Sequence, residues 1–169
     1  EGGSHGDLYV TDFARDENGK IKLSNEGKPG LSSEKFGVFM GNMNAPYQLG
    51  WNNTFTYKGF SLYFLADGRI GGKVISFTQA FLDFEGLSMR SGEARQAYEA
   101  NKNSLTYRYS DSQGTEHTVP GMLMPDGQLT SIESYYKGIG GDVNATQYVY
   151  DATNFRLREV SLGYTFRNV

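Results

Sequence analysis

Residues 47–70 read YQLGWNNTFTYKGFSLYFLADGRI, and this stretch decides the fold class that the sequence predicts. Apolar residues occupy alternate positions of 47–57, with Asn53 as the one polar exception, and polar residues stand between them. After Lys58-Gly59 the same alternation restarts and covers 60–70. A period of two residues is typical of a β-strand with one apolar and one polar face. The stretch therefore predicts a hairpin of two antiparallel strands.

The short turn fixes how the two strands pair. A two-residue turn sets Tyr57 opposite Phe60, so the apolar faces of both strands coincide, and Asp67 and Arg69 lie on the polar face. Each predicted strand is eleven residues long, whereas soluble strands have about five or six residues and membrane-barrel strands about 9–11. The length favours a transmembrane β-barrel in which Asp67 and Arg69 face the lumen. Alternation alone fits a β-sandwich hairpin equally well.

Two further hairpins are predicted on either side of this stretch. Asn18-Gly19 supplies the positive φ angles of a tight turn between 8–15 and 20–24. Segment 103–110 alternates, turns, and returns through 115–119. Both signals agree with a chain rich in aromatic residues and glycine, which favour strands and turns over helices.

The segment after the central hairpin predicts a helix and a long loop. Residues 91–100 are typical of a short loop helix with Ser91 as its N-cap. Residues 120–146 show no period and are interpreted as an ordered long loop, which carries Tyr135 and Tyr136.

In the last segment of the sequence, the alternation of apolar and polar residues shifts once by one position. Its apolar parity switches between Leu157 and Val160, so one extra residue near Arg158-Glu159 predicts a β-bulge. No repeat or linker divides the chain, so 1–169 is expected to form one partial β-barrel region. The expected fold class is all-β, with mainly antiparallel strands and hairpins, long loops and a short loop helix.

Composition excludes several classes of protein. Sixteen basic residues against nineteen acidic ones give a net charge of −3, and the basic residues are scattered, which disfavours nucleic-acid binding. The absence of Cys excludes disulfide scaffolds and thiol catalysis. No run approaches the roughly 18 apolar residues of a membrane helix, although a membrane β-barrel needs no such run.

A search for catalytic motifs yields only weak candidates. His5 and His117 are the only histidines, and no H-E-x-x-H, G-x-S-x-G or phosphate-loop pattern occurs. Gly138-Ile139-Gly140-Gly141 is interpreted as a turn. The carboxylates Asp83 and Glu85 are expected to face solvent rather than to perform acid–base chemistry. The sequence therefore predicts no enzyme, no metal site and no cofactor.

Three blocks of residues carry a resemblance to a known family. The blocks Tyr57-Lys58-Gly59-Phe60-Ser61-Leu62 and Asp67-Gly68-Arg69-Ile70-Gly71-Gly72-Lys73-Val74 resemble the barrel of SusC/RagA family TonB-dependent outer-membrane transporters. Residues 151–166 are similar to the strand that the family carries near its C-terminal end. Smaller blocks fit the same template in the same order: Gly6–Tyr9, Asp16–Lys20, Gly41-Asn42, Gly86–Ser88, Ala94-Arg95 and Tyr135-Tyr136.

This resemblance implies a location in the cell outer membrane and a 22-stranded transmembrane β-barrel with a plugged lumen. It implies import of oligosaccharides, peptides or other oligomeric nutrients, with a SusD-like surface lipoprotein as lid and with TonB engaged through an N-terminal part. The plug, the TonB box and the last strands lie outside the chain, which is therefore expected to be a C-terminal portion of the barrel in contact with outer-membrane lipid. Tyr135 and Tyr136 are expected in an extracellular loop. The alternatives are a secreted all-β carbohydrate-binding module and a glycosidase fragment with two carboxylates.

Overall fold

The computed structural model describes residues 3–101, 105–141 and 144–166. In this part of the chain, antiparallel β-sheet predominates and is accompanied by three α-helices and one 3-10 helix. The predicted predominance of antiparallel strands is confirmed, although helix is more extensive than the one short loop helix that was expected.

The chain divides into two compact units, each built from separate stretches of sequence. The sequence shows no linker that marks the boundary between the two units. Unit 1 comprises Glu1–Leu8, Gly41–Val74 and Tyr150–Val169, and unit 2 comprises Tyr9–Met40 and Ile75–Val149.

The central hairpin of unit 1 is confirmed at both ends. Strand β3 spans Tyr47–Tyr57 and strand β4 spans Phe60–Ile70. The two strands pair antiparallel, and the last residue of β3 faces the first residue of β4 across the turn. Lys58 and Gly59 have φ angles of 46° and 91°. Two consecutive positive φ angles are characteristic of the type I′ turn, whose twist matches that of the flanking strands.

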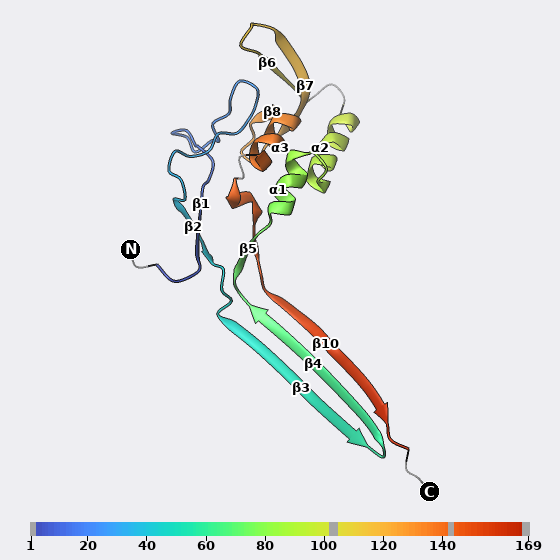
Figure 1. Ribbon diagram of the computed structural model, residues 1–169. Helices are drawn as coiled ribbons and strands as arrows, with labels where there is room; N and C mark the ends of the chain where they lie inside the picture. Colours follow the sequence, from blue (N-terminus) through green and yellow to red (C-terminus); the bar gives the residue numbers. More distant parts are fainter. Residues whose placement is uncertain (1–2, 102–104, 142–143, 167–169) are drawn as a thin grey trace. The chain divides into compact units, whose positions relative to one another are not determined.

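Strand β10, Asn154–Tyr164, lies on the other side of β4 and completes a three-stranded sheet in the order β10-β4-β3, visible in Figure 1. The register of β10 against β4 shifts between Leu157 and Glu159, which leaves Arg158 as the extra residue. The predicted β-bulge is therefore confirmed. Because the bulge resets the phase, Val160–Tyr164 keep their apolar side chains on the same face as Leu157.

Four shorter strands form two small sheets in which β1 pairs with β2 and β5 pairs with β9. The predicted hairpin between 8–15 and 20–24 is therefore wrong. Strand β1 is shorter than the predicted segment 8–15, and it pairs with β2 rather than with 20–24. What remains of that hairpin is an isolated bridge between Arg15 and Ile21. The bounds of the short strands are β1 Asp7–Val10, β2 Val38–Asn42, β5 Lys73–Ile75 and β9 Val149–Asp151.

The predicted turn at Asn18-Gly19 is confirmed, and its geometry recurs in unit 2. In each case a glycine N–H donates to the carbonyl three residues earlier, and the glycine has a φ angle between 79° and 82°. Such an angle is strained for residues with a Cβ, which explains glycine at this place of each turn. The four turns are Asp16–Lys20, Ser24–Lys28, Asp111–Thr115 and Met124–Gln128.

A second three-stranded antiparallel sheet, in the order β6-β7-β8, belongs to unit 2. It consists of β6 Thr106–Ser110, β7 Glu116–Leu123 and β8 Leu129–Ser131. The predicted hairpin of 103–110 with 115–119 is confirmed for β6 and β7, while residues 103 and 104 lie outside the described residues.

Three α-helices accompany this sheet, and in the described part of the chain none is long and apolar enough to span a membrane. Helix α2, Met89–Ala100, confirms the predicted helix, but its N-cap is Ser88 rather than Ser91. The Ser88 hydroxyl accepts from the Ser91 N–H at 3.1 Å, because Ser88 has the extended backbone that an N-cap requires. The other helices are α1 Phe77–Phe84, α3 Ile132–Gly141 and the 3-10 helix η1 Ala145–Tyr148.

The interpretation of 120–146 as a long loop is wrong. This stretch contains the end of β7, the whole of β8 and helix α3, and its residues 142 and 143 lie outside the described residues. Gly138-Ile139-Gly140-Gly141, interpreted as a turn, forms the last turn of α3. Glycine lowers helix propensity by about 1 kcal/mol per residue, so the sequence argued against a helix that tertiary packing stabilises.

That packing is a close contact between helices α1 and α3. A Cβ on Gly140 would lie 2.4 Å from the carbonyl oxygen of Ala80 and 2.6 Å from the backbone N of Phe84. The missing side chain thus lets the two helix backbones meet. The contact lies beside the apolar core of unit 2, which consists of Phe13, Ile21, Ala80, Met124, Ile132, Tyr135, Tyr136, Ile139 and Tyr148.

Replacing Gly140 with alanine should therefore destabilise unit 2, whereas replacing Gly92, a glycine of another helix, with alanine should not. We expect Gly140→Ala to cost about 1–3 kcal/mol, because its methyl group must push the α1 backbone away. Gly92→Ala in α2 meets no atom within 4 Å and should stabilise the protein by about 0.5–1 kcal/mol. Hydrogen exchange of α1 and α3 peptides measures both effects, and equal protection in the two variants contradicts the proposed contact.

Candidate functional site

The two predicted lumen-facing residues lie on the polar face of the three-stranded sheet. Asp67 and Arg69 alternate with the apolar residues of β4, as the sequence predicts. The bulged residue Arg158 reaches the same face, where its Nη2 donates to Asp67 Oδ2 at 2.6 Å. The bulge thus supplies a cation for a carboxylate on the neighbouring strand.

The opposite face of this sheet is apolar and largely exposed. The cross-strand registers align the apolar positions of all three strands. Apart from Phe64 and Ala66, which are half-buried, the large residues at these positions are between 38% and 73% exposed. Contiguous apolar patches of this kind mark sites that contact a partner or a membrane. The large exposed side chains of this apolar face are Tyr47, Leu49, Trp51, Phe55, Tyr57, Phe60, Leu62, Ile70, Phe155, Leu157, Val160, Leu162 and Tyr164.

Tyr135 and Tyr136 lie on helix α3 rather than in a loop, and they are only 7% and 8% exposed. Their rings meet edge to face with centroids 5.3 Å apart. The Tyr136 hydroxyl donates to the carbonyl of Arg90 at 3.1 Å. These contacts place both rings in the core of unit 2 rather than in an exposed loop.

A buried carboxylate, which the sequence predicted to be solvent-facing, joins three elements of unit 2. Asp83 in α1 is fully buried. Its carboxylate accepts from Arg90 Nε of α2 at 3.0 Å and from the Tyr148 hydroxyl of η1 at 2.8 Å. Arg90 Nη2 makes a further ion pair with the same group. We call Asp83, Arg90 and Tyr148 the Asp83 cluster.

Hydrogen bonds keep the Asp83 cluster charged at neutral pH. Burial by itself raises the pKa of Asp83, but hydrogen bonds from Arg90, Ser88 and Tyr148 outweigh burial and hold the pKa below its ordinary value of 3.8. Burial, together with the adjacent carboxylate, raises the pKa of Tyr148, so its phenol remains a donor. With its carboxylate and guanidinium paired, the cluster fixes α1, α2 and η1 to one another rather than offering a reactive group.

The two histidines do not come together in a metal site. His117 Nε2 lies 2.9 Å from Asp111 Oδ2, and its ring stacks on Tyr109 at 5.0 Å. Both contacts belong to the hairpin of β6 and β7. Across the residues that the structure describes, no three His, Asp or Glu side chains gather closely enough to hold a metal ion.

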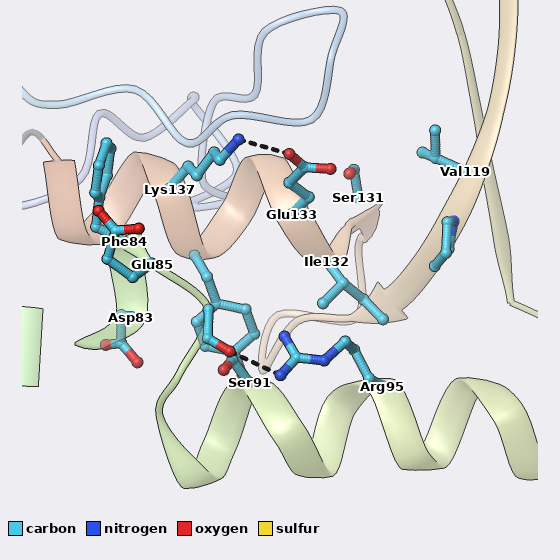
Figure 2. A pocket seen from close by; sticks show the side chains of 13 residues that line it. Asp83, Phe84, Glu85, Ser91, Arg95, Val119, Ser131, Ile132, Glu133 and Lys137 are labelled. Atoms are coloured by element: carbon cyan, nitrogen blue, oxygen red, sulfur yellow. Dashed lines mark hydrogen bonds and ion pairs between the residues drawn. The ribbon is translucent and has the colours of Figure 1, made fainter. Parts of the chain in front are cut away.

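A cleft of about 610 Å³ opens beside the Asp83 cluster, between the end of α1, α2, β7 and α3 (Figure 2). Phe84, Ile132 and Tyr136 contribute apolar lining. On α3, Lys137 Nζ forms an ion pair with Glu133 Oε1 at 2.6 Å. On α2, Arg95 Nη2 donates to the carbonyl of Gly86 at 2.7 Å. The cleft therefore combines an apolar interior with charged groups from two helices.

Sequence reasoning missed the Asp83 cluster and the cleft because their residues belong to no motif. The expectation that Asp83 faces solvent is wrong, while Glu85 is exposed as expected. The available signal was the three-residue spacing of Ala80 and Asp83, which puts both on the inner face of a helix. That helix was not predicted, because its apolar run follows a strand directly.

No protein-family model matches the chain, and no curated protein matches it either.

Removing the buried carboxylate should destabilise unit 2. We expect Asp83→Asn to cost about 3 kcal/mol, because Arg90 loses its paired charge, and Tyr148→Phe to cost about 1.5 kcal/mol through one lost hydrogen bond. Because the folded-state pKa of Asp83 is lowered, the stability it contributes is present above its ordinary pKa and is lost as the pH falls through the lower folded-state value.

Hydrogen exchange of the α1 and α2 peptides between pH 2 and 6, with rates corrected for intrinsic exchange, measures this contribution. Glu85→Gln, at an exposed position of the same segment, is the matched control and should leave protection unchanged. A smaller effect for Asp83→Asn than for the control contradicts the role assigned to the cluster.

Proposed function

We propose that the chain is part of the β-barrel of an outer-membrane TonB-dependent nutrient transporter of the SusC/RagA type. In this proposal the parent protein imports oligosaccharides or other oligomeric nutrients, including peptides, with a SusD-like surface lipoprotein as its partner. The observation that carries the proposal is the exposed apolar face of the three-stranded sheet.

The dimensions of the sheet support this placement. Strands β3, β4 and β10 each have eleven residues, which matches the roughly 9–11 residues that a tilted strand needs to cross a bilayer. One face carries aromatic and aliphatic side chains, and the other carries Asp67, Arg69 and Arg158 together with Tyr63 and Leu65. In a membrane barrel, the apolar face of such a sheet would contact lipid and the polar face would line the lumen.

The connections of the sheet support an orientation. Strands β3 and β4 are joined by two residues, whereas 71–153 connects β4 to β10. The Thr165 N–H donates to the Gly59 carbonyl at 2.8 Å, so the far end of β10 lies beside the short turn. Short turns of outer-membrane barrels are periplasmic and long connections extracellular. In the proposal, residues 75–149 of unit 2 are therefore an extracellular insertion.

The open edges of the sheet also fit a larger barrel. Within the described residues, the sheet ends at β3 on one side and at β10 on the other. Unpaired backbone groups on such edges are costly in a bilayer, so neighbouring strands of a parent barrel would have to pair with them. A carbohydrate-binding module remains the alternative, in which the same apolar face meets sugar and water instead of lipid.

Cysteine labelling in the full-length protein in native membranes distinguishes these functions. Phe55 and Thr54 are neighbours on β3 with opposite orientations, so Phe55→Cys and Thr54→Cys form a matched pair. We expect a lipid-soluble maleimide to label Phe55→Cys preferentially and a water-soluble maleimide to label Thr54→Cys. Reversed labelling contradicts the orientation, and equal labelling of both by the water-soluble reagent favours the secreted module.

The transport function is tested by replacing 75–149 with a short Gly-Ser linker in the full-length protein. Because β4 and β10 are paired neighbours, a short connection can join them without disturbing the sheet. We expect the barrel to insert normally, while nutrient uptake or association with the surface lipoprotein falls. Unchanged uptake and unchanged association in a correctly inserted variant contradict a role of unit 2 in nutrient capture.

A further inference from the structure

The cleft of unit 2 contains a cation that is held in place but not neutralised. Arg95 projects from α2, and its Nη2 bond to the Gly86 carbonyl fixes the guanidinium at the end of α1. Among the described residues, no carboxylate forms an ion pair with Arg95, so its remaining N–H groups are free to bind an anion. A guanidinium that is already ordered loses less side-chain entropy on binding.

The surface next to Arg95 is apolar. Ile132 lines the same cleft as Arg95, and Figure 2 draws both side chains. Tyr136 and Phe84 line the same cleft, and Val119 and Pro120 of β7 add aliphatic surface. An apolar group bound there would exchange water for carbon contacts, while a charged group on it would reach the guanidinium.

The remaining charges of the cleft limit the charge of a ligand. Lys137 is neutralised by Glu133, and Asp83 is neutralised by Arg90. Glu85 adds one further carboxylate to the lining. A ligand with one negative charge therefore meets the guanidinium of Arg95, whereas the second charge of a dianion finds the other cation of this lining, Lys137, already paired and is repelled by Glu85.

We propose that this cleft binds a monocarboxylate with an apolar body, whose carboxylate is held by Arg95 and whose body packs against Ile132, Tyr136 and Phe84. The guanidinium and a carboxylate match in geometry and can form two parallel hydrogen bonds. This site goes beyond the proposed transport function, and it does not depend on where the three-stranded sheet lies.

Photolabelling of the full-length protein with 4-azidobenzoate tests the site, because this probe joins one carboxylate to an apolar ring. We expect labelled peptides within 84–95 or 119–137. Benzoate should compete with the probe, whereas its uncharged isostere benzamide and the dianion phenyl phosphate should compete about tenfold less well or worse. Equal competition by benzamide, or labelling elsewhere only, overturns the proposal; equal competition by phenyl phosphate overturns the selectivity for a monoanion.

Substitution of the cation provides an independent measurement. Arg95→Gln keeps a polar side chain but lacks the charge, so labelling should fall about tenfold or more. Arg108→Gln removes an exposed cation of β6 that does not line the cleft, and labelling should be unchanged. Hydrogen exchange of α2 and α3 establishes that both variants are folded. Wild-type labelling in folded Arg95→Gln overturns the proposal, and the maleimide pattern on β3 is unaffected by either result.

Discussion

The structure of unit 1 depends on one constraint, which is that the apolar faces of strands β3, β4 and β10 must lie on the same side of the sheet. A two-residue turn with two positive φ angles meets this constraint between β3 and β4. Between β4 and β10 it is met by the single extra residue at Arg158. A slip of one residue at either place would exchange the two faces of a strand. The same bulge brings Arg158 to Asp67, so the geometry that preserves the apolar face also pairs a charge on the polar one.

Unit 2 is organised by a buried polar cluster and by a glycine contact. Asp83 receives hydrogen bonds from α2 and η1, and Gly140 lets α3 approach the backbone of α1. The buried Asp–Arg pair specifies how the helices are joined, although such pairs add little net stability over an apolar replacement. The cleft lies beside this arrangement and is lined by Ser91 and Arg95 of α2. Its cation, Arg95, is oriented by the backbone that ends α1.

The sequence predicted the elements whose signals are local and missed those that tertiary packing decides. The hairpin 47–70 and the bulge at Arg158 were predictable, because a period of two is visible in the residues themselves. Helix α3 was not, because Gly138-Ile139-Gly140-Gly141 opposes a helix locally and is stabilised by tertiary packing, including its close contact with α1. The Asp83 cluster and the cleft depend on the same helix packing. No spacing in one sequence shows that Asp83 meets Tyr148, or that Arg95 forms no ion pair with a carboxylate of the described residues.

The composition of the apolar face has a practical consequence for spectroscopy. Trp51 is the only tryptophan of the sequence, and it lies on that face with 61% of its surface exposed and its ring in edge-to-face contact with Phe64. All indole emission from these residues therefore originates on the surface whose surroundings distinguish a bilayer from water. The emission maximum of the indole shifts with solvent polarity, so ultraviolet light alone can report what covers the sheet, without any chemical label.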